Sequence, residues 1–272
     1  MLFLRLSLVT TYAKTHNLFN KLNMHDQKTK PSLLFIHGFR GNHLGLEEVV
    51  NHFKDLGYSV YCPDIPPAYN MQNENLKTLD DFTAEGYATW IANYILENKL
   101  DQPILIGHSM GSIIAAATAS KYPSLINDQI FFLSPISEHT PRFIRFIIPL
   151  IAFIPNKLVS FVVTKYLIGT IGKPHFKSIL KVTNRCAAKF TSKSDEIKAA
   201  KFSVQYAISD FNFQKTCFFI AGKEDRLNRI SQTKKVAAKF HGKTTLIAKT
   251  GHLINYEVPD ELFKLIYQEL PK

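Results

Sequence analysis

Cysteine is scarce in this sequence, whose 272 residues contain three, at positions 62, 186 and 217. Three thiols so far apart along the chain are too few for a disulfide framework or a structural zinc site. They are typical of a reduced, cytoplasmic protein in which buried cysteines behave as small apolar residues. We therefore expect a fold held by its apolar core, without disulfides or metal.

Low-complexity tracts, internal repeats and uninterrupted apolar runs long enough for a membrane span are also missing. The stretch 143–163 is mostly apolar, but it contains Arg145 and Lys157 and is broken by Pro149 and Pro155. Charges and prolines within so short a stretch favour packed helices over a transmembrane helix. With 46% hydrophobic and 20% charged residues, the composition excludes disordered, collagen-like and coiled-coil chains.

The N-terminal stretch 1–9 has two interpretations. It combines one early arginine with an apolar run, and the first acidic residue is Asp26, as in a targeting peptide. Leucines at positions 2, 4, 6 and 8, however, alternate with other residues, which is the period of a half-buried strand. Because no convincing cleavage site follows, we expect a strand and keep the targeting segment as the alternative.

Acidic residues are fewer than basic ones, 22 against 33, so the formal net charge is +11. Most of the excess lies in residues 136–200, which hold 11 basic and 3 acidic residues, against 22 and 19 elsewhere. No zinc-finger, helix-turn-helix or ribonucleoprotein motif accompanies this charge, so we expect no nucleic-acid partner. Since the same segment is strongly apolar, its basic character favours a lipid surface.

From residue 32 onward, short apolar runs alternate with longer amphipathic ones. This order predicts an α/β fold, with a mostly parallel central sheet covered by helices on both faces. The expected strands are 32–36, 58–62, 104–106, 129–133, 216–221 and 244–248. The expected helices are 46–56, 78–99, 112–121, 231–240 and 259–270, the second opened by a capping box formed by Thr78 and Asp81.

The alternation stops between residues 136 and 200, which lie between two expected strands. Open α/β sheets bind ligands at strand ends, where such an insertion would stand. We expect residues 1–135 and 201–272 to form the core and residues 136–200 an inserted helical cap. Apolar residues recur in the insertion at spacings of three and four: Phe143, Phe146, Ile147, Leu150, Ile151 and Ile154.

This predicted cap has two open interpretations. Its apolar face could pack on the core, which is the commoner use of an amphipathic stretch. It could instead make peripheral contact with a membrane, because basic residues flank the apolar ones as they do at lipid interfaces. The flanking residues are Arg142, Arg145, Lys157 and Lys165.

A serine between two glycines follows one expected strand and precedes a helix, in Gly107-His108-Ser109-Met110-Gly111. A sharp strand-to-helix turn projects the serine hydroxyl, and the glycines let strand and helix approach closely. The helix N-terminus behind the serine offers N–H groups to a developing oxyanion. An ordinary glycine-rich turn is the alternative, but the strand–turn–helix context favours a nucleophile elbow.

Two further motifs precede this elbow. His37-Gly38-Phe39 follows the first buried strand, and Asp64 ends Tyr61-Cys-Pro-Asp64. In kind and order, the motifs resemble those of the α/β-hydrolase superfamily, and the resemblance covers nearly the whole chain. It implies a serine esterase or lipase-like enzyme with an α/β core and a helical cap. It also implies that Asp64 braces loops and is not catalytic.

By the same resemblance, the backbone N–H groups of Phe39 and Met110 form an oxyanion hole. His37 is then a residue that holds the loop, with general base as its less favoured alternative. Gly107, His108 and Gly111 surround the nucleophile in the elbow.

A serine nucleophile needs a base that is itself oriented by an acid. The family places the acid, then the histidine, after the serine. Among ten histidines, His252 matches the family position, since it follows the last expected strand in Thr250-Gly-His252. His241, at a helix end, and His175, in the insertion, are the other candidates.

Asp225 matches the family's acid, because it ends Gly222-Lys-Glu-Asp225 after a strand. Glu224 is its nearest alternative. Glu138 is another, since some relatives place the acid after the preceding strand. We expect Ser109, Asp225 and His252 to form a catalytic triad.

The resemblance implies hydrolysis of a carboxylic ester, such as an acylglycerol, through an acyl-enzyme on Ser109. The substrate is then a small acyl ester, and no metal or organic cofactor is needed. Dehalogenases and epoxide hydrolases of this fold use an aspartate in place of the serine. Two alternatives stay open: a carbon–carbon bond hydrolase with the same triad, and a triad-bearing small-molecule receptor with little turnover.

Overall fold

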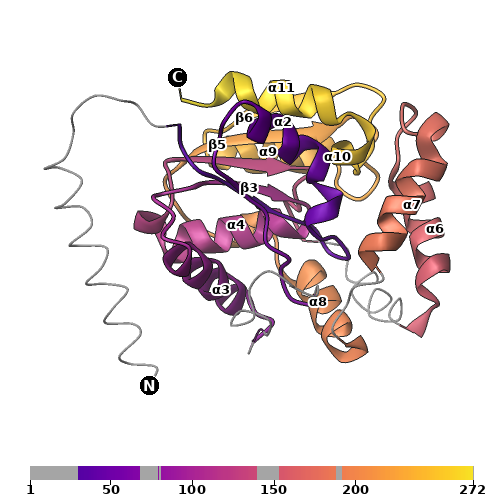
Figure 1. The fold of residues 1–272 in the computed structure, drawn as a ribbon, viewed down its shortest axis with the longest axis horizontal. Coiled ribbons are helices and arrows are strands. Elements are labelled where there is room, and N and C mark those ends of the chain that lie inside the picture. The colour runs from indigo at the N-terminus through magenta and orange to yellow at the C-terminus, as the bar shows by residue number, and fades with distance from the viewer. Residues whose placement is uncertain (1–29, 68–78, 80, 140–152, 188–191, 272) are drawn as a thin grey trace, which may run out of the picture.

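The computed structural model describes residues 30–67, 79, 81–139, 153–187 and 192–271. Within them, a sheet is covered by helices on both sides (Figure 1). The predicted α/β class is confirmed. The expected N-terminal strand lies outside the described residues, as do five of the six spaced apolar residues that begin at Phe143, and Arg142 and Arg145.

The described sheet has six strands in the order β2-β1-β3-β4-β5-β6, and every neighbouring pair is parallel. Parallel pairing brings the carboxyl ends of the strands to one edge, where ligands bind in open α/β sheets. The strands are β1 (Leu33–Ile36), β2 (Val60–Tyr61), β3 (Ile104–His108), β4 (Gln129–Leu133), β5 (Thr216–Gly222) and β6 (Lys243–Ile247).

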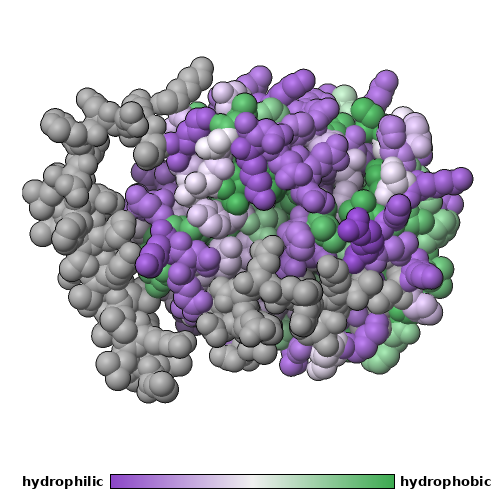
Figure 2. All heavy atoms as spheres, viewed as in Figure 1, coloured by the Kyte–Doolittle hydropathy of each residue, from purple (hydrophilic) through white to green (hydrophobic). Residues whose placement is uncertain are grey.

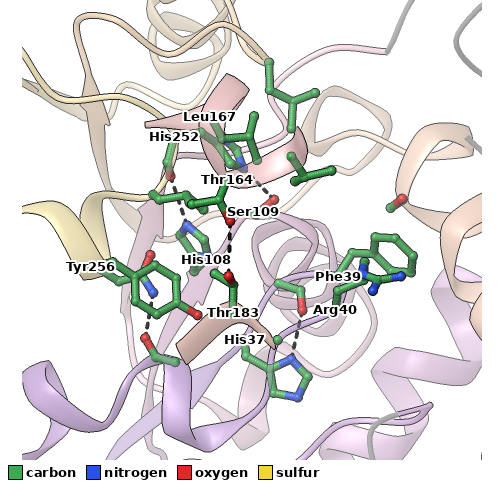
Figure 3. Close-up of a pocket in the computed structure, with 18 of the residues that line it drawn as sticks. His37, Phe39, Arg40, His108, Ser109, Thr164, Leu167, Thr183, His252 and Tyr256 are labelled. Carbon is green, nitrogen blue, oxygen red and sulfur yellow. Dashed lines mark hydrogen bonds between the residues drawn. The ribbon is translucent and has the colours of Figure 1, made fainter. Parts of the chain in front are cut away.

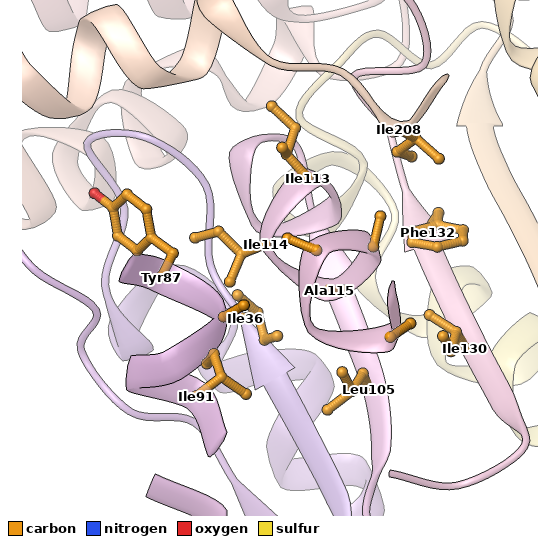
Figure 4. Close-up of a cluster of buried hydrophobic side chains, with 14 of the residues drawn as sticks. Ile36, Tyr87, Ile91, Leu105, Ile113, Ile114, Ala115, Ile130, Phe132 and Ile208 are labelled. Carbon is orange, nitrogen blue, oxygen red and sulfur yellow. The ribbon is translucent and has the colours of Figure 1, made fainter. Parts of the chain in front are cut away.

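Alternate residues of the strands enter two apolar clusters on opposite faces of the sheet. Leu34 and Phe132 belong to the cluster that also contains the buried side of two helices, α3 (Ala84–Glu97) and α4 (Met110–Lys121) (Figure 4). Their neighbours Leu33 and Phe131 belong to the other cluster, with α2 (Glu47–Asp55) and α11 (Pro259–Glu269). Burial on both faces explains why the strands are almost continuously apolar.

Helix α3 corrects one prediction. It begins at Ala84, not at residue 78, and its N-cap is Thr83, whose side chain accepts a hydrogen bond from the N–H of Gly86 (3.1 Å). Residues 81–83 are not helical, because the chain at Asp81 folds back onto the first turn. A Cβ added to Gly86 would lie 1.9 Å from the Asp81 carbonyl oxygen.

Among the described residues between β4 and β5, in the part of the chain for which we predict a cap, there are three α-helices. They are α6 (Asn156–Leu167), α7 (Phe176–Ala187) and α8 (Lys193–Gln205). In Figure 1, α6 and α7 run side by side at one end of the molecule. The helices that follow β5 are α9 (Ile230–Lys239), α10 (Ile254–Glu257) and α11, whose bounds are given above. In the described part of the chain, no helix is both long and apolar enough to cross a membrane.

Candidate active site

Ser109 stands in the sharp turn between β3 and α4. Its backbone has φ 52° and ψ −118°, a conformation that costs a non-glycine residue about 1–3 kcal/mol. The flanking glycines are required by space: a Cβ on Gly107 would lie 2.4 Å from the Gly111 carbonyl oxygen, and one on Gly111 would lie 2.1 Å from that of Ile36. The predicted turn therefore forms, with its serine projecting from a strained backbone.

A chain of hydrogen bonds links Ser109, His252 and Asp225. Asp225 Oδ2 lies 2.8 Å from His252 Nδ1, and His252 Nε2 lies 2.8 Å from Ser109 Oγ. An ionised carboxylate only accepts, so Nδ1 carries the proton and Nε2 accepts from the serine hydroxyl. The structure thus brings together the three residues that the sequence singled out, from the chain that follows β3, β5 and β6.

Asp225 is fixed by its own turn. Its Oδ1 accepts hydrogen bonds from the N–H groups of Leu227 (2.8 Å) and Asn228 (3.0 Å), which leaves Oδ2 for the histidine. Burial alone would raise the pKa of Asp225. His252 and the two N–H donors outweigh that effect, so the pKa lies below its ordinary value of 3.8 and the carboxylate is charged at neutral pH.

The backbone of His252 is held from two sides. Its N–H donates to the carbonyl oxygen of Leu167 at the end of α6 (2.8 Å), and its carbonyl oxygen accepts from His108 Nε2 (3.2 Å). Burial, and then the neighbouring His252, lower the pKa of His108 to about 3. His108 is therefore neutral and acts here as a hydrogen-bond donor that positions the histidine beside Ser109.

The loop after β1 passes directly beside the serine. A Cβ on Gly38 would lie 3.0 Å from Ser109 Cβ, and Phe39 lines the pocket around Ser109. His37 holds this loop: its Nε2 accepts from the N–H of Ile65 (2.8 Å), and its Nδ1 donates to the Gly38 carbonyl oxygen (2.9 Å). Burial lowers the pKa of His37, in keeping with a neutral ring that supports the loop.

Met110, the other residue of the predicted oxyanion hole, is the first residue of α4 and directly follows the serine. The first N–H groups of a helix have no partner within the helix, and its N-terminus favours negative charge. The loop at Phe39 and the start of α4 therefore flank Ser109 as the sequence predicted.

The other candidates lie apart from this chain of bonds. Glu138 is ion-paired with Lys235 (2.6 Å), and Glu224 accepts from the N–H of Thr170 (2.7 Å). His241 and His175 are both exposed. Asp64 accepts two hydrogen bonds from His43, one from its N–H and one from its ring, each 2.8 Å long. These bonds agree with the role of a loop brace.

Glu257, which no sequence motif marks, is a buried carboxylate that joins the end of α6 to the loop of His252. Its Oε2 accepts from the N–H of Gly169 (2.7 Å), and its Oε1 accepts from the N–H of Gly251 (3.0 Å). Burial raises the pKa of this carboxyl, although those N–H groups oppose the shift. The one available signal was an acidic residue in a mostly apolar stretch, five residues after His252.

A second missed contact joins Arg40, in the loop after β1, to Glu196 on α8. The two side chains form an ion pair and are 10% and 1% exposed. Glu196 also accepts from Lys193 Nζ (3.1 Å), so the buried carboxylate is satisfied by two cations, as a buried charge requires. Nothing in the local sequence could pair residues so far apart in the chain.

Ser109 and His252 open into a cavity of about 250 Å³. In Figure 3 they lie between Tyr256 on one side and Phe39 and Arg40 on the other. The helices between β4 and β5 contribute much of the wall, through Ser160, Val163, Thr164, Leu167, Thr183, Ser203 and Val204. Most of the remaining lining comes from the loop after β1 and from the residues around His252.

Known proteins share this architecture. Residues 31–150 match the family model of the alpha/beta hydrolase fold. The solved esterase EaEST from Exiguobacterium antarcticum superimposes with a TM-score of 0.78 at 14% identity, over 90% of this chain and 93% of that one. The chain has the alpha/beta hydrolase fold. A thermophilic esterase from Thermogutta terrifontis, at 15% identity and a TM-score of 0.74, shares the fold over 90% of each chain.

Relatives by sequence agree with this assignment. A provisionally named esterase/lipase 2 of Mycoplasma pneumoniae is 21% identical over 257 residues, which cover 88% of each chain. The uncharacterized hydrolase YugF of Bacillus subtilis is 24% identical over 250 residues, 85% of this chain and 86% of that one. These similarities support an enzyme of the hydrolase type.

Proposed function

We propose that this α/β-hydrolase is a serine esterase that cleaves carboxylic esters through an acyl-enzyme on Ser109. The observation that carries the proposal is the hydrogen-bonded chain from Ser109 through His252 to Asp225, with both of its bonds 2.8 Å long. A nucleophile, a base and an orienting acid within hydrogen-bond reach are the requirements for nucleophilic acyl transfer.

The first half of the reaction forms the acyl-enzyme. Ser109 Oγ attacks the ester carbonyl carbon while His252 Nε2 takes the hydroxyl proton, and Asp225 stabilises the resulting imidazolium. The N–H groups of Phe39 and Met110 stabilise the oxyanion of the tetrahedral intermediate. The intermediate collapses by breaking the bond to the alcohol oxygen, which leaves with the proton from His252.

The second half regenerates the enzyme. A water molecule gives a proton to His252 Nε2 and attacks the carbonyl carbon of the acyl-enzyme. The bond between that carbon and Ser109 Oγ then breaks, and Oγ recovers the proton from His252. A carboxylic acid is released, and no cofactor enters the cycle.

The cavity favours a small substrate. At about 250 Å³ it falls just below the roughly 300–1,000 Å³ of most small-molecule sites. Several of its walls are apolar, among them Ile136, Val163, Val204 and Leu227. An ester with a short acyl chain fits this space better than a long-chain lipid.

Steady-state turnover of p-nitrophenyl esters, from acetate to laurate, tests the proposal. We expect the highest kcat/KM for the short acyl chains. Ser109→Ala should lose on the order of 10⁴–10⁶ in kcat, because triad members act as a unit. Ser120→Ala, which changes an exposed serine on α4, is the matched control and should keep the wild-type kcat.

Three results would contradict this proposal. If Ser109→Ala keeps the wild-type turnover of these esters, Ser109 is not the nucleophile. Tight binding of esters by the wild-type chain without turnover would instead indicate a receptor. Cleavage of a diketone in preference to all esters would favour the carbon–carbon bond hydrolase.

A further inference from the structure

Large apolar side chains that are exposed to solvent gather in one segment of the described chain. Of nine such side chains, each at least 39% exposed, seven lie between residues 153 and 171. They are Phe153, Ile154, Leu158, Phe161, Val162, Tyr166 and Ile171. Single exposed apolar residues are ordinary, but a cluster on one element marks an interaction surface.

Four of the seven lie on helix α6, and the other three lie in the chain just before and after it. Its inner side supplies Val163, Thr164 and Leu167 to the pocket wall. Leu158 and Val162, one turn apart, are 53% and 54% exposed on its outer side. A helix that is apolar on both sides is typical of a buried helix, so the outer side of α6 is suited to burial against something else.

The neighbouring helix α7 adds positive charge. Lys177, Lys181 and Arg185 recur every four residues, and all three are exposed, so they form a stripe along α7. Phe161 of α6 packs edge-on against Phe176 of α7, with ring centroids 5.5 Å apart. Figure 2 shows hydrophobic and hydrophilic side chains interspersed at the end of the molecule where Figure 1 places these helices.

Acidic residues are absent from the described stretch 153–187, which contains six basic ones. The basic residues are Lys157, Lys165, Lys173, Lys177, Lys181 and Arg185. We call these six residues and the seven exposed apolar ones the α6–α7 surface. Its charge has one sign throughout, so two copies of it would repel each other if they met face to face.

We propose that the α6–α7 surface docks the protein on a membrane that contains anionic lipid. Apolar side chains on a helix enter the boundary between headgroups and acyl chains, while surrounding lysines pair with lipid phosphates. Tyr166 suits that boundary, because tyrosine offers an apolar ring and a polar hydroxyl. The docking does not depend on the proposed esterase activity, because none of the side chains it uses touches Ser109.

Docking is tested by co-sedimentation of the full chain with vesicles. Vesicles of phosphatidylcholine alone are compared with vesicles that also contain phosphatidylglycerol, at low and at high salt. We expect binding to the anionic vesicles that weakens as salt rises, because salt screens the attraction. The lipid partition, and not turnover, is the readout, so failure of the esterase proposal would leave this result unaffected.

Matched variants locate the surface. Lys177→Glu/Lys181→Glu should lower the partition into anionic vesicles by at least about tenfold, since each cation near such a surface contributes roughly fivefold. The control is Lys234→Glu/Lys264→Glu, which makes the same change of charge on exposed residues of α9 and α11. It should lose much less binding. Thermal unfolding verifies that both variants are folded.

The apolar part of the surface has its own variant, Leu158→Gln/Val162→Gln, which keeps the charge unchanged. Its partition should fall by about tenfold or more, because burial of the two side chains is lost. Equal losses in both charge variants would show a non-specific effect of net charge and overturn the proposal. So would full binding by the glutamine variant, or no binding to anionic vesicles by the wild type.

Discussion

The carboxyl edge of the sheet and the pair α6–α7 are held in place in different ways. Ser109, Asp225 and His252 follow β3, β5 and β6, and the parallel pairing of these strands fixes where each of them ends. Helices α6 and α7 pack on each other. The end of α6 contacts the His252 loop, because the Leu167 carbonyl oxygen accepts a hydrogen bond from the N–H of His252.

The two kinds of support suit two different roles, catalysis at the sheet edge and shaping of the pocket by the helices. Groups that exchange a proton need their positions fixed within fractions of an ångström, which a paired sheet provides. Groups that shape a pocket or face the surroundings tolerate looser support. The two regions meet at Glu257, whose carboxylate binds Gly169 on one side and Gly251 on the other.

The largest effect should come from the sheet edge, in Asp225→Asn. An amide cannot stabilise the imidazolium of His252 and favours the wrong ring tautomer, so kcat should fall by roughly 10³–10⁴. Steady-state hydrolysis of a p-nitrophenyl ester measures it. Glu138→Gln, which removes the rival carboxylate, should keep the wild-type kcat. If the two effects were exchanged, the acid would follow β4 and the assignment of Asp225 would be wrong.

A smaller effect is expected where the two regions meet. Glu257→Gln places an amide NH₂ against one of two backbone N–H donors, so a buried hydrogen bond is lost and the free energy of unfolding should fall by about 1–3 kcal/mol. Urea unfolding measures this change. Glu224→Gln is the control, because Glu224 holds the same turn at Thr170 from a position that is only partly buried. A larger loss of unfolding free energy in Glu224→Gln than in Glu257→Gln would show that Glu257 does not anchor the end of α6.

The smallest effect concerns pH. Burial keeps His108 and His37 neutral, with the pKa of His108 at about 3 and that of His37 below 6.5. Below pH 6.5 these two histidines take up protons in the unfolded chain but stay neutral in the folded protein. The free energy of unfolding should therefore fall as the pH drops. Urea unfolding across this pH range measures the fall. A free energy of unfolding that rises as the pH drops below 6.5 would contradict this expectation.

Much of the fold could be predicted, because a parallel sheet buried on both faces imposes its pattern locally. The strands that lead to Ser109 and Asp225 are apolar runs followed by glycine-containing turns, and such runs are visible in the sequence. The start of α3 was wrong because its first turn depends on how the chain folds back at Asp81, a contact that no periodicity reports.

The contacts of Glu257 and of Arg40 with Glu196 could not be predicted for a related reason. Each joins residues distant in sequence, and single-sequence patterns carry no information on such pairing. The outer side of α6 is a different case. Its apolar spacing is in the sequence, but whether those side chains face the core or solvent depends on tertiary packing.

Ser109 and His252 should act as one unit, and a comparison of the two single variants with the double variant tests this. Turnover of one ester is measured for Ser109→Ala, His252→Ala and the combined variant. We expect the same residual rate for all three, because either change removes the whole unit. A combined loss equal to the product of the two single losses would contradict it, since the residues would then act independently.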